Sequence, residues 1–372
     1  MKLQRCVAPR ITNFAILKAP KDQDLWLHCW GPDKLRKEIS KIFVVIGDAL
    51  AIFEHSAGKW HVAEELQGKD PQVVALDRSR PTRMYCGTFG KGLWVSDDLG
   101  ENWKNNENFA PTSSAGITSL GASPKSIYVG TEPSKIYRSN DGGETWNHLS
   151  ELERLPSSNS WSFPPRPDTS HVRTILCDPA KEEMVYAAIE AGALVRSFDG
   201  GAHWKDRVEG GPFDTHNLAA SRSGPGKLYS SAGDGYFESS DYGETWRRKM
   251  RGLAQRYMYG VAVHPNDPDT VLVSCSPAPW NAYNSANAES HIYRKSKGEE
   301  SWVEITDGLP NPQGTTASFL IPSEDSLGEF YACNNRGVFI SQDSGRSWRS
   351  LEVPWKQSFK SQPVRHAALS PS

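Results

Sequence analysis

The chain has 372 residues and a formal net charge of −2, with 42 Lys and Arg against 44 Asp and Glu. This even balance, without a long run of either sign, argues against a nucleic-acid-binding surface or a polybasic membrane anchor. No segment approaches the roughly 18 apolar residues of a membrane-spanning helix, and the first residues lack the apolar stretch of a signal peptide. We therefore expect a cytoplasmic protein without nucleic-acid or membrane partners.

The composition favours an all-β protein. Aromatic residues make up 10% of the chain and stand alongside 31 Gly and 25 Pro. Such a mixture is typical of many short strands joined by tight turns. Because the chain is longer than a usual single domain, we looked for a repeat that would spread the core along the sequence.

Residues 1–40 precede the first regular pattern. They contain two apolar runs, ITNFAIL and LWLHCW, which could add a strand or cover a face but have no periodicity that places them. We treat residues 1–40 as an N-terminal extension of uncertain structure. The regular pattern begins at residue 41, where KIFVVIG and ALAIF read as two consecutive strands.

A motif of the form Ser-x-Asp-x-Gly-x-x-Trp then recurs along the chain. Two degenerate copies end at Trp60 and Trp302, and five full copies lie at 96–103, 139–146, 197–204, 239–246 and 341–348. Four of the six intervals between the seven tryptophans are 42–46 residues, close to the roughly 40–45 residues of a four-stranded propeller blade. The repeat predicts a seven-bladed β-propeller of four-stranded antiparallel blades.

The chemistry of the motif indicates a tight turn between the third and fourth strands of a blade. Its Asp carboxylate can accept backbone N–H bonds across the turn, and its Gly can adopt a positive φ. The Asp residues of the five full copies are therefore expected to be structural rather than catalytic. They are Asp98, Asp141, Asp199, Asp241 and Asp343.

The first and last parts of the repeat complement each other. The unit at 171–208 shows the full order, with strands expected at 171–179, 183–190, 193–198 and 203–208. The first unit lacks a convincing first strand, whereas PVRHAALSPS at 363–372 reads as a first strand with nothing after it. Pairing the C-terminal strand with the N-terminal blade leaves no free sheet edge. We therefore predict a single closed propeller over residues 41–372.

Two connections are longer than a blade requires. Residues 151–170 join a fourth strand to the next first strand, and residues 276–290 join a second strand to a third. Because neighbouring strands run in opposite directions, both connections should emerge on the same face, opposite the Asp-containing turns. Functional residues on rigid scaffolds concentrate on such loops, so we expect a ligand site on this face.

The first strand of each blade should line the central channel. Five of these strands end in a proline, and the position six residues before each proline is polar, as are two positions aligned by pattern. This predicts a polar ring near the channel mouth, although a water-filled channel would have polar walls without any ligand. The seven positions are Gln72, Thr118, Arg173, Asn217, Tyr259, Thr316 and Arg365.

Loops around this ring add aromatic, cationic and acidic side chains, which suit a sugar or a small anionic ligand. Three carboxylates, Glu190, Asp214 and Asp234, are nominated for acid–base catalysis, since glycoside hydrolysis normally needs two facing carboxyl groups. The predicted ligand-binding residues are Trp161, Arg166, His171, Arg173, His216, Arg256, Tyr257, Tyr259, Trp280, Arg336 and Arg365.

Metal-binding patterns are weak. His171 and His216 beside Asp214 could hold an ion, but such histidines more often bond to backbone or water, so neither a metal nor a cofactor is predicted. The six cysteines form no CxxC pair and have no metal-ligand spacing with His. Four lie in apolar strand-like runs, as expected for buried reduced thiols: Cys86, Cys177, Cys275 and Cys333.

The recurring motif resembles the Asp-box, or BNR, repeat of sialidases, xyloglucan-cleaving hydrolases, sortilin-type receptors and photosystem II assembly factors. The segments WSFPPRPDTSHVRTI, DTHNLA, RYMYGVAVHP and CSPAP are similar to bacterial propellers described as BNR-repeat or sialidase-like, over roughly residues 41–370. This resemblance implies the propeller fold. Sialidases carry an Arg-Ile-Pro motif near the start and have six blades. This sequence has no Arg-Ile-Pro and seven expected blades, so sialidase activity is not implied.

Two functions are open at this point. One is a binding propeller, like the photosystem assembly factors, whose elaborated face binds a ligand or a protein partner without catalysing a reaction on it. The other is a glycan-acting hydrolase or lyase that uses the nominated carboxylates with Trp161 and Trp280 as sugar platforms. The first is favoured because no catalytic motif stands out. An enzyme would need carboxyl groups converging on a closed pocket.

Overall fold

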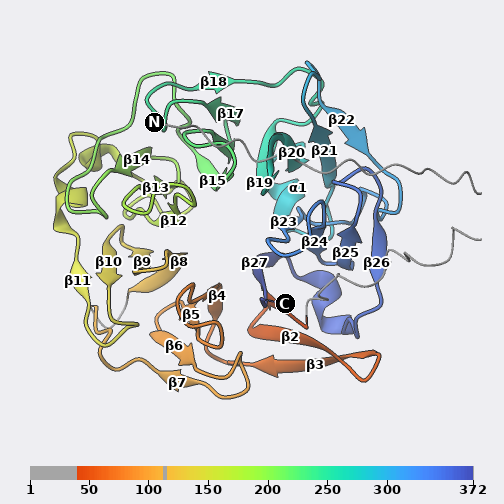
Figure 1. Cartoon of the computed structure of the whole chain (residues 1–372), viewed down its shortest axis with the longest axis horizontal. Coiled ribbons are helices and arrows are strands. Elements are labelled where there is room, and N and C mark those ends of the chain that lie inside the picture. The colour runs from red at the N-terminus through yellow and green to blue at the C-terminus, as the bar shows by residue number, and fades with distance from the viewer. Residues whose placement is uncertain (1–39, 112–114, 372) are drawn as a thin grey trace, which may run out of the picture. The chain divides into compact units, whose positions relative to one another are not determined.

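The computed structural model describes residues 40–111 and 115–371. The predicted N-terminal extension, residues 1–40, lies outside the described residues except for its last one. Within the described ranges, strands β1 to β27 form seven antiparallel sheets. Figure 1 shows these sheets arranged around a central axis, each with one strand nearest the centre. The chain is a seven-bladed β-propeller, as predicted.

The first three blades come from the N-terminal part of the chain and from its last strand. Blade one, from the centre outward, comprises β27 (Val364–Leu369), β1 (Lys41–Ile46), β2 (Ala49–Ser56) and β3 (Lys59–Glu65). Blade two comprises β4 (Pro71–Leu76), β5 (Met84–Thr88), β6 (Leu93–Ser96) and β7 (Lys104–Asn105). Blade three comprises β8 (Gly116–Ala122), β9 (Ile127–Glu132), β10 (Ile136–Ser139) and β11 (Asn147–His148).

Four further blades complete the ring. Blade four has β12 (Val172–Cys177), β13 (Val185–Ile189) and β14 (Ala193–Ser197), and blade five has β15 (Thr215–Ala220), β16 (Leu228–Ala232), β17 (Gly235–Ser239) and β18 (Arg247–Arg248). Blade six has β19 (Tyr257–His264), β20 (Asp267–Ser276), β21 (His291–Lys295) and β22 (Val303–Ile305). Blade seven has β23 (Phe319–Pro322), β24 (Phe330–Asn334), β25 (Gly337–Ser341) and β26 (Arg349–Leu351).

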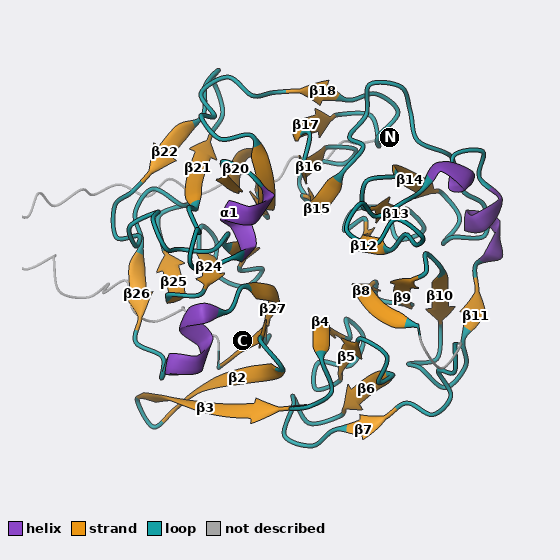
Figure 2. Cartoon of the chain, turned by 180° about the vertical axis from the view of Figure 1, so that it is seen from behind, coloured by secondary structure: helices purple, strands orange, loops and turns teal. Residues whose placement is uncertain are grey.

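Short helices interrupt the connections. The first insertion contains the 3-10 helices η1 (Ser150–Arg154) and η2 (Ser158–Ser160), and η3 (Gln357–Ser361) precedes β27. The second insertion contains α1 (Pro279–Tyr283), which Figure 2 places beside the inner strands. Among the described residues, no helix has both the length and the apolar character needed to cross a membrane.

The C-terminal strand closes the ring. Strand β27 pairs antiparallel with β1, and Ala368 lies opposite Phe43. Beyond the strand, the backbone N–H of Ser370 donates to the carbonyl of Lys41 at 3.0 Å. The inner strands contact one another in sequence, with β27 between β23 and β4. This confirms the predicted closure of the N-terminal blade by the C-terminal strand.

The core lies between neighbouring blades. Strands β1, β5, β13, β16 and β24 are buried along their whole length. Since both faces of a blade pack against other blades, these strands read as nearly continuous apolar runs rather than as an alternating pattern. Three of the four described cysteines, Cys86, Cys275 and Cys333, are buried as reduced thiols, and Cys177 is partly buried.

The recurrent turn has the geometry that its residues predict. In all five full copies, the Asp carboxylate accepts the backbone N–H of the residue four positions later, at 2.9–3.0 Å. The motif's Ser hydroxyl accepts the N–H of the Gly at 2.7–2.9 Å, and that Gly has a φ of 79–93°. Each copy forms the turn that leads from the third strand of its blade to the outermost segment of the same blade.

Blade four departs from the predicted pattern. Its expected fourth strand, 203–208, is reduced to a single pairing of Lys205 with Arg196. The chain turns away after this pair because the carboxylate of Asp206 accepts the backbone N–H of Ser157 at 2.8 Å and also its hydroxyl. The segment is thus bound to the first insertion instead of continuing along the sheet.

Candidate functional site

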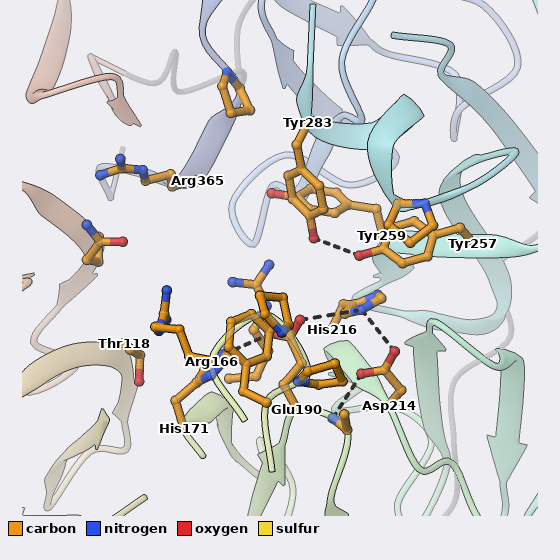
Figure 3. Close-up of a pocket in the computed structure, with 18 of the residues that line it drawn as sticks. Thr118, Arg166, His171, Glu190, Asp214, His216, Tyr257, Tyr259, Tyr283 and Arg365 are labelled. Carbon is orange, nitrogen blue, oxygen red and sulfur yellow. Dashed lines mark hydrogen bonds and ion pairs between the residues drawn. The ribbon is translucent and has the colours of Figure 1, made fainter. Parts of the chain in front are cut away.

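A cavity of about 850 Å³ lies where both insertions meet the inner strands. The first insertion contributes Phe163 and Arg166 to its lining, and the second contributes Trp280 and Tyr283. This agrees with the prediction that the two long connections share a face. Figure 3 shows the labelled polar side chains of the lining, which converge from several blades.

Six of the seven inner strands carry a β-bulge, and the bulge determines which side chain reaches the cavity. In each case the pairing register skips one residue, so that this residue has no partner on the second strand of its blade. Bulges re-aim a side chain at the point where the ladder is interrupted. All six skipped residues line the cavity: Gln72, Thr118, Arg173, His216, Tyr259 and Arg365.

Five positions of the predicted ring lie at these bulges on the cavity wall, and two lie elsewhere. In blade five the skipped residue is His216, and Asn217 instead lines a smaller cavity that also borders Arg173 and His366. In blade seven, β23 begins at Phe319 and Thr316 lies before it, fully buried. The backbone N–H of Thr316 donates to Oδ1 of Asn335 at 2.9 Å, and this residue lines neither cavity.

Glu190 lies one residue beyond β13, against the basic side chains of His171 and Arg173. Its Oε2 lies 2.8 Å from Nε2 of His171 and 3.3 Å from Nε of Arg173. Burial opposes its ionisation, but the Arg173 guanidinium and the hydrogen bond from His171 outweigh burial and lower the pKa of Glu190 to about 2. Glu190 is therefore an anion at neutral pH.

Asp214 and His216 lie on blade five, next to Glu190. Nε2 of His216 is 3.6 Å from Oδ2 of Asp214 and 3.9 Å from Oε1 of Glu190. Burial raises the pKa of Asp214, and repulsion from the Glu190 carboxylate adds to this effect. The backbone N–H of Ala191 donates to the other oxygen of Asp214 at 2.9 Å.

Three tyrosines from blade six and α1 line the neighbouring part of the cavity. The hydroxyls of Tyr257 and Tyr283 are 2.9 Å apart, and the hydroxyl of Tyr259 donates to the carbonyl of Val364 at 2.9 Å. Burial raises the pKa of all three phenols. They are therefore neutral hydrogen-bonding groups at neutral pH rather than phenolate nucleophiles.

The remaining arginines of the cavity are anchored by carboxylates. Arg166 forms a two-point ion pair with Glu132 and lies over the ring of Phe163, 4.9 Å from its centroid. Nη1 of Arg365 donates to Oδ1 of Asp70 at 2.6 Å. Each guanidinium is thereby held in one orientation while part of it still lines the cavity.

Four predicted site residues do not line the cavity. Trp161 packs on the core of blade four, and its Nε1 donates to the Ser157 hydroxyl at 3.0 Å. Asp234 accepts the backbone N–H of Asp214 at 3.3 Å, so it supports the loop that carries Asp214. Arg256 and Arg336 are exposed elsewhere.

The structure also adds residues that the sequence patterns did not nominate. Tyr283, Phe163, Phe89 and Asp70 line the cavity. Tyr283 and Phe163 lie within the two insertions, so their position in long connections was the available signal. Phe89 and Asp70 flank the ends of strands in blade two, and no sequence pattern pointed to either of them.

Two of the three nominated carboxylates line the cavity. Glu190 and Asp214 lie side by side, with the His216 imidazole against both. Hydrolysis of a glycosidic bond normally uses two carboxyl groups that flank the bond, one of them protonated. Of the three nominated carboxylates, Asp234 is outside the cavity and Glu190 is held ionised.

Solved structures with the same fold include two proteins named YCF48. YCF48 bound to D1 peptide is 18% identical with a TM-score of 0.56, over 78% of this chain and 84% of that one. YCF48 from Cyanidioschyzon merolae is 13% identical with a TM-score of 0.55, over 77% of this chain and 86% of that one.

A glycoside hydrolase also shares the fold. An ancestral GH74 enzyme is 15% identical with a TM-score of 0.60, and the match covers 85% of this chain but only 40% of the enzyme. At such identities the likeness shows the fold alone.

Comparison at the level of sequence identifies the family. A search of curated proteins found no match. The family described as photosynthesis system II assembly factor YCF48 matches residues 73–358, which is well over half of the chain. The protein therefore belongs to the YCF48 family of photosystem II assembly factors.

Proposed function

We propose that the cavity binds an extended segment of a protein partner. The observation that carries this proposal is Trp280, a cavity-lining side chain that is 66% exposed. Tryptophan is enriched among the few residues that dominate the energy of protein interfaces, because its large ring gains most when it leaves water. An exposed tryptophan on the wall of a cavity is therefore well placed to anchor a ligand.

The rest of the lining suits a peptide. The first insertion adds an apolar surface of Phe163, Pro164 and Pro165. The inner strands add polar groups, among them Arg173 and Arg365, that can bind backbone carbonyls or a carboxylate. A peptide presents both kinds of surface, with apolar side chains and regularly spaced polar backbone groups.

The family comparison supports the same ligand class. One solved YCF48 structure is bound to a D1 peptide. That protein is only 18% identical to this chain, so we propose a peptide ligand here without carrying over its sequence. The alternative of a glycan-acting hydrolase or lyase has less support, because Asp234 lies outside the cavity and Glu190 and Asp214 lie side by side with the His216 imidazole against both.

Binding can be tested with displayed random linear peptides, selected on the purified chain and then measured by fluorescence polarisation. We expect Trp280→Ala to weaken the selected peptide about 30-fold, as for a hot-spot side chain worth about 2 kcal/mol. The matched control is Leu327→Ala, which removes a side chain of similar exposure, 60%, outside the cavity.

Two results would contradict the proposal. One is the absence of any selected peptide, and the other is full affinity in the Trp280→Ala variant. Binding on a glycan array, together with turnover that Glu190→Gln abolishes, would instead support the hydrolase alternative.

A further inference from the structure

Three side chains of the cavity wall each direct one metal-ligating atom toward a common point. Glu190 comes from blade four, and Asp214 and His216 come from blade five. One ligand atom of each lies within 4.8 Å of the others. Figure 3 shows the three side chains facing one another at the edge of the cavity. Two of them belonged to the nominated catalytic set, but their arrangement points to a different chemistry.

In each of the two carboxylates, one oxygen is bound by neighbouring groups. The other oxygen is directed at the common point between the three side chains. Oε2 of Glu190 is bound by His171 and Arg173, whereas Oε1 faces His216. Oδ1 of Asp214 accepts the backbone N–H of Ala191, whereas Oδ2 faces His216. Such outer hydrogen bonds fix the orientation of ligands in metal sites.

His216 is held in the same way. Its Nδ1 lies 2.6 Å from the carbonyl oxygen of Met258 and must donate to it, so the neutral ring presents a lone pair at Nε2. The side chain is 1% exposed, and Nε2 has no hydrogen-bond partner. A buried lone pair that faces two carboxylates is repelled by them unless a cation lies between them.

The spacing suits a metal ion between the three ligand atoms. Nε2 of His216 lies 3.6 Å from Oδ2 of Asp214 and 3.9 Å from Oε1 of Glu190, beyond hydrogen-bond distance of both. Bonds of about 2.1 Å in a tetrahedral zinc site separate ligand atoms by roughly 3.4 Å. The two distances from His216 are close to this spacing, and all three ligand atoms lie within 4.8 Å of one another.

We propose that Glu190, Asp214 and His216 bind a divalent transition-metal ion, and that zinc is the ion the site prefers. An imidazole ligand favours zinc over magnesium and calcium, which prefer oxygen ligands alone. The two carboxylates neutralise the charge of the ion, and the Arg173 guanidinium lies against the far oxygen of Glu190. Because all three ligands line the cavity, the fourth coordination position is open to water or a bound ligand.

The test uses the full chain, stripped with a chelator and titrated with zinc alone by isothermal titration calorimetry. We expect one zinc ion per chain in the wild type, with binding more than about 100-fold weaker in Asp214→Asn and in His216→Gln. Substitution with Co²⁺ gives a second readout, since the visible absorption of the tetrahedral ion should appear in the wild type and be lost in both variants.

The chain offers a matched control. His291 also lies against two carboxylates, Glu289 at 3.0 Å and Glu304 at 2.6 Å, but both of its ring nitrogens are already engaged. We therefore expect His291→Gln to bind zinc like the wild type. Zinc binding that is lost in His291→Gln and kept in His216→Gln would place the ion at His291 and overturn the proposal.

Other outcomes are equally decisive. The proposal is wrong if the stripped wild type takes up no zinc, or if Asp214→Asn binds zinc with unchanged affinity. If circular dichroism shows that His216→Gln does not fold, the test rests on Asp214→Asn alone. We expect this variant to fold, because its amide oxygen can still accept the N–H of Ala191. Zinc uptake by Trp280→Ala separates this result from the peptide-binding proposal, since that variant keeps all three ligands.

Discussion

Arg166 and Glu132 form a two-point ion pair, with Nε to Oε1 at 2.7 Å and Nη2 to Oε2 at 2.6 Å. Arg166 belongs to the first insertion, whereas Glu132 is the last residue of β9 in the preceding blade. The side chain of Glu132 is only 6% exposed. The pair therefore fastens the insertion to the rigid part of the propeller and so sets one wall of the cavity.

Removing the guanidinium should leave the Glu132 carboxylate buried without its partner. We expect Arg166→Ala to lower the free energy of unfolding by about 1–3 kcal/mol, near the lower end because Arg166 is half exposed. Urea denaturation measures this change. Arg256→Ala, at an exposed position outside the cavity, should stay within about 0.5 kcal/mol of the wild type. Equal stability of the two variants would show that the ion pair contributes nothing.

Removing the closing strand should abolish the folded ring. Without residues 364–372, strand β1 becomes a sheet edge whose buried residues, among them Ile42 and Val44, are exposed to water. We expect loss of cooperative thermal unfolding by circular dichroism, and aggregation on size exclusion. Deletion of residues 371–372 alone keeps Ser370 and its bonds to Lys41 and should melt like the wild type. A truncated chain that remains monomeric and melts normally would contradict this account of closure.

The recurrent turns should lose stability in acid. Side-chain and backbone N–H and O–H donors, Thr145 first among them, lower the pKa of Asp141 from 3.8 to about 2. A carboxylate whose pKa is lower in the folded state stabilises the protein above pH 3.8, and this stabilisation disappears as the pH falls toward 2.

The Asn substitution isolates this effect. We expect Asp141→Asn to melt below the wild type at neutral pH, with the difference in melting temperature shrinking between pH 4 and pH 2. Glu144→Gln, which removes an exposed carboxylate from the same turn, should change little at any pH. A melting difference for Asp141→Asn that is constant across this range would exclude the proposed role of its charge.

The architecture could be predicted because it depends on features that repeat. Tryptophans such as Trp103 and Trp146 recur at blade length, and each follows a turn whose Asp and Gly have few structural alternatives. The pairing of β27 with β1 followed from the same repeat, since an unmatched first strand at one end requires an unmatched blade at the other.

The candidate site could be predicted only in part, because bulges and side-chain directions are local. Counting back six residues from the proline at the end of the first strand located Arg173 and Tyr259. Blade five has no such proline, so its ring position was placed at Asn217, one residue beyond His216. Trp161 was expected in the cavity, but its ring packs into the core of blade four. Tyr283 was missed because the segment that became α1 read as an irregular loop.

The bulges in the inner strands have a consequence for variation among related chains. A residue that is skipped by the pairing register has no partner on the second strand of its blade, so the ladder there does not depend on which side chain it carries. Six such positions surround one cavity and come from six different blades. Ligand preference can therefore diversify at the positions whose side chains do not hold another blade, whereas Thr118, His216 and Tyr259 also bond to backbone carbonyls of other blades.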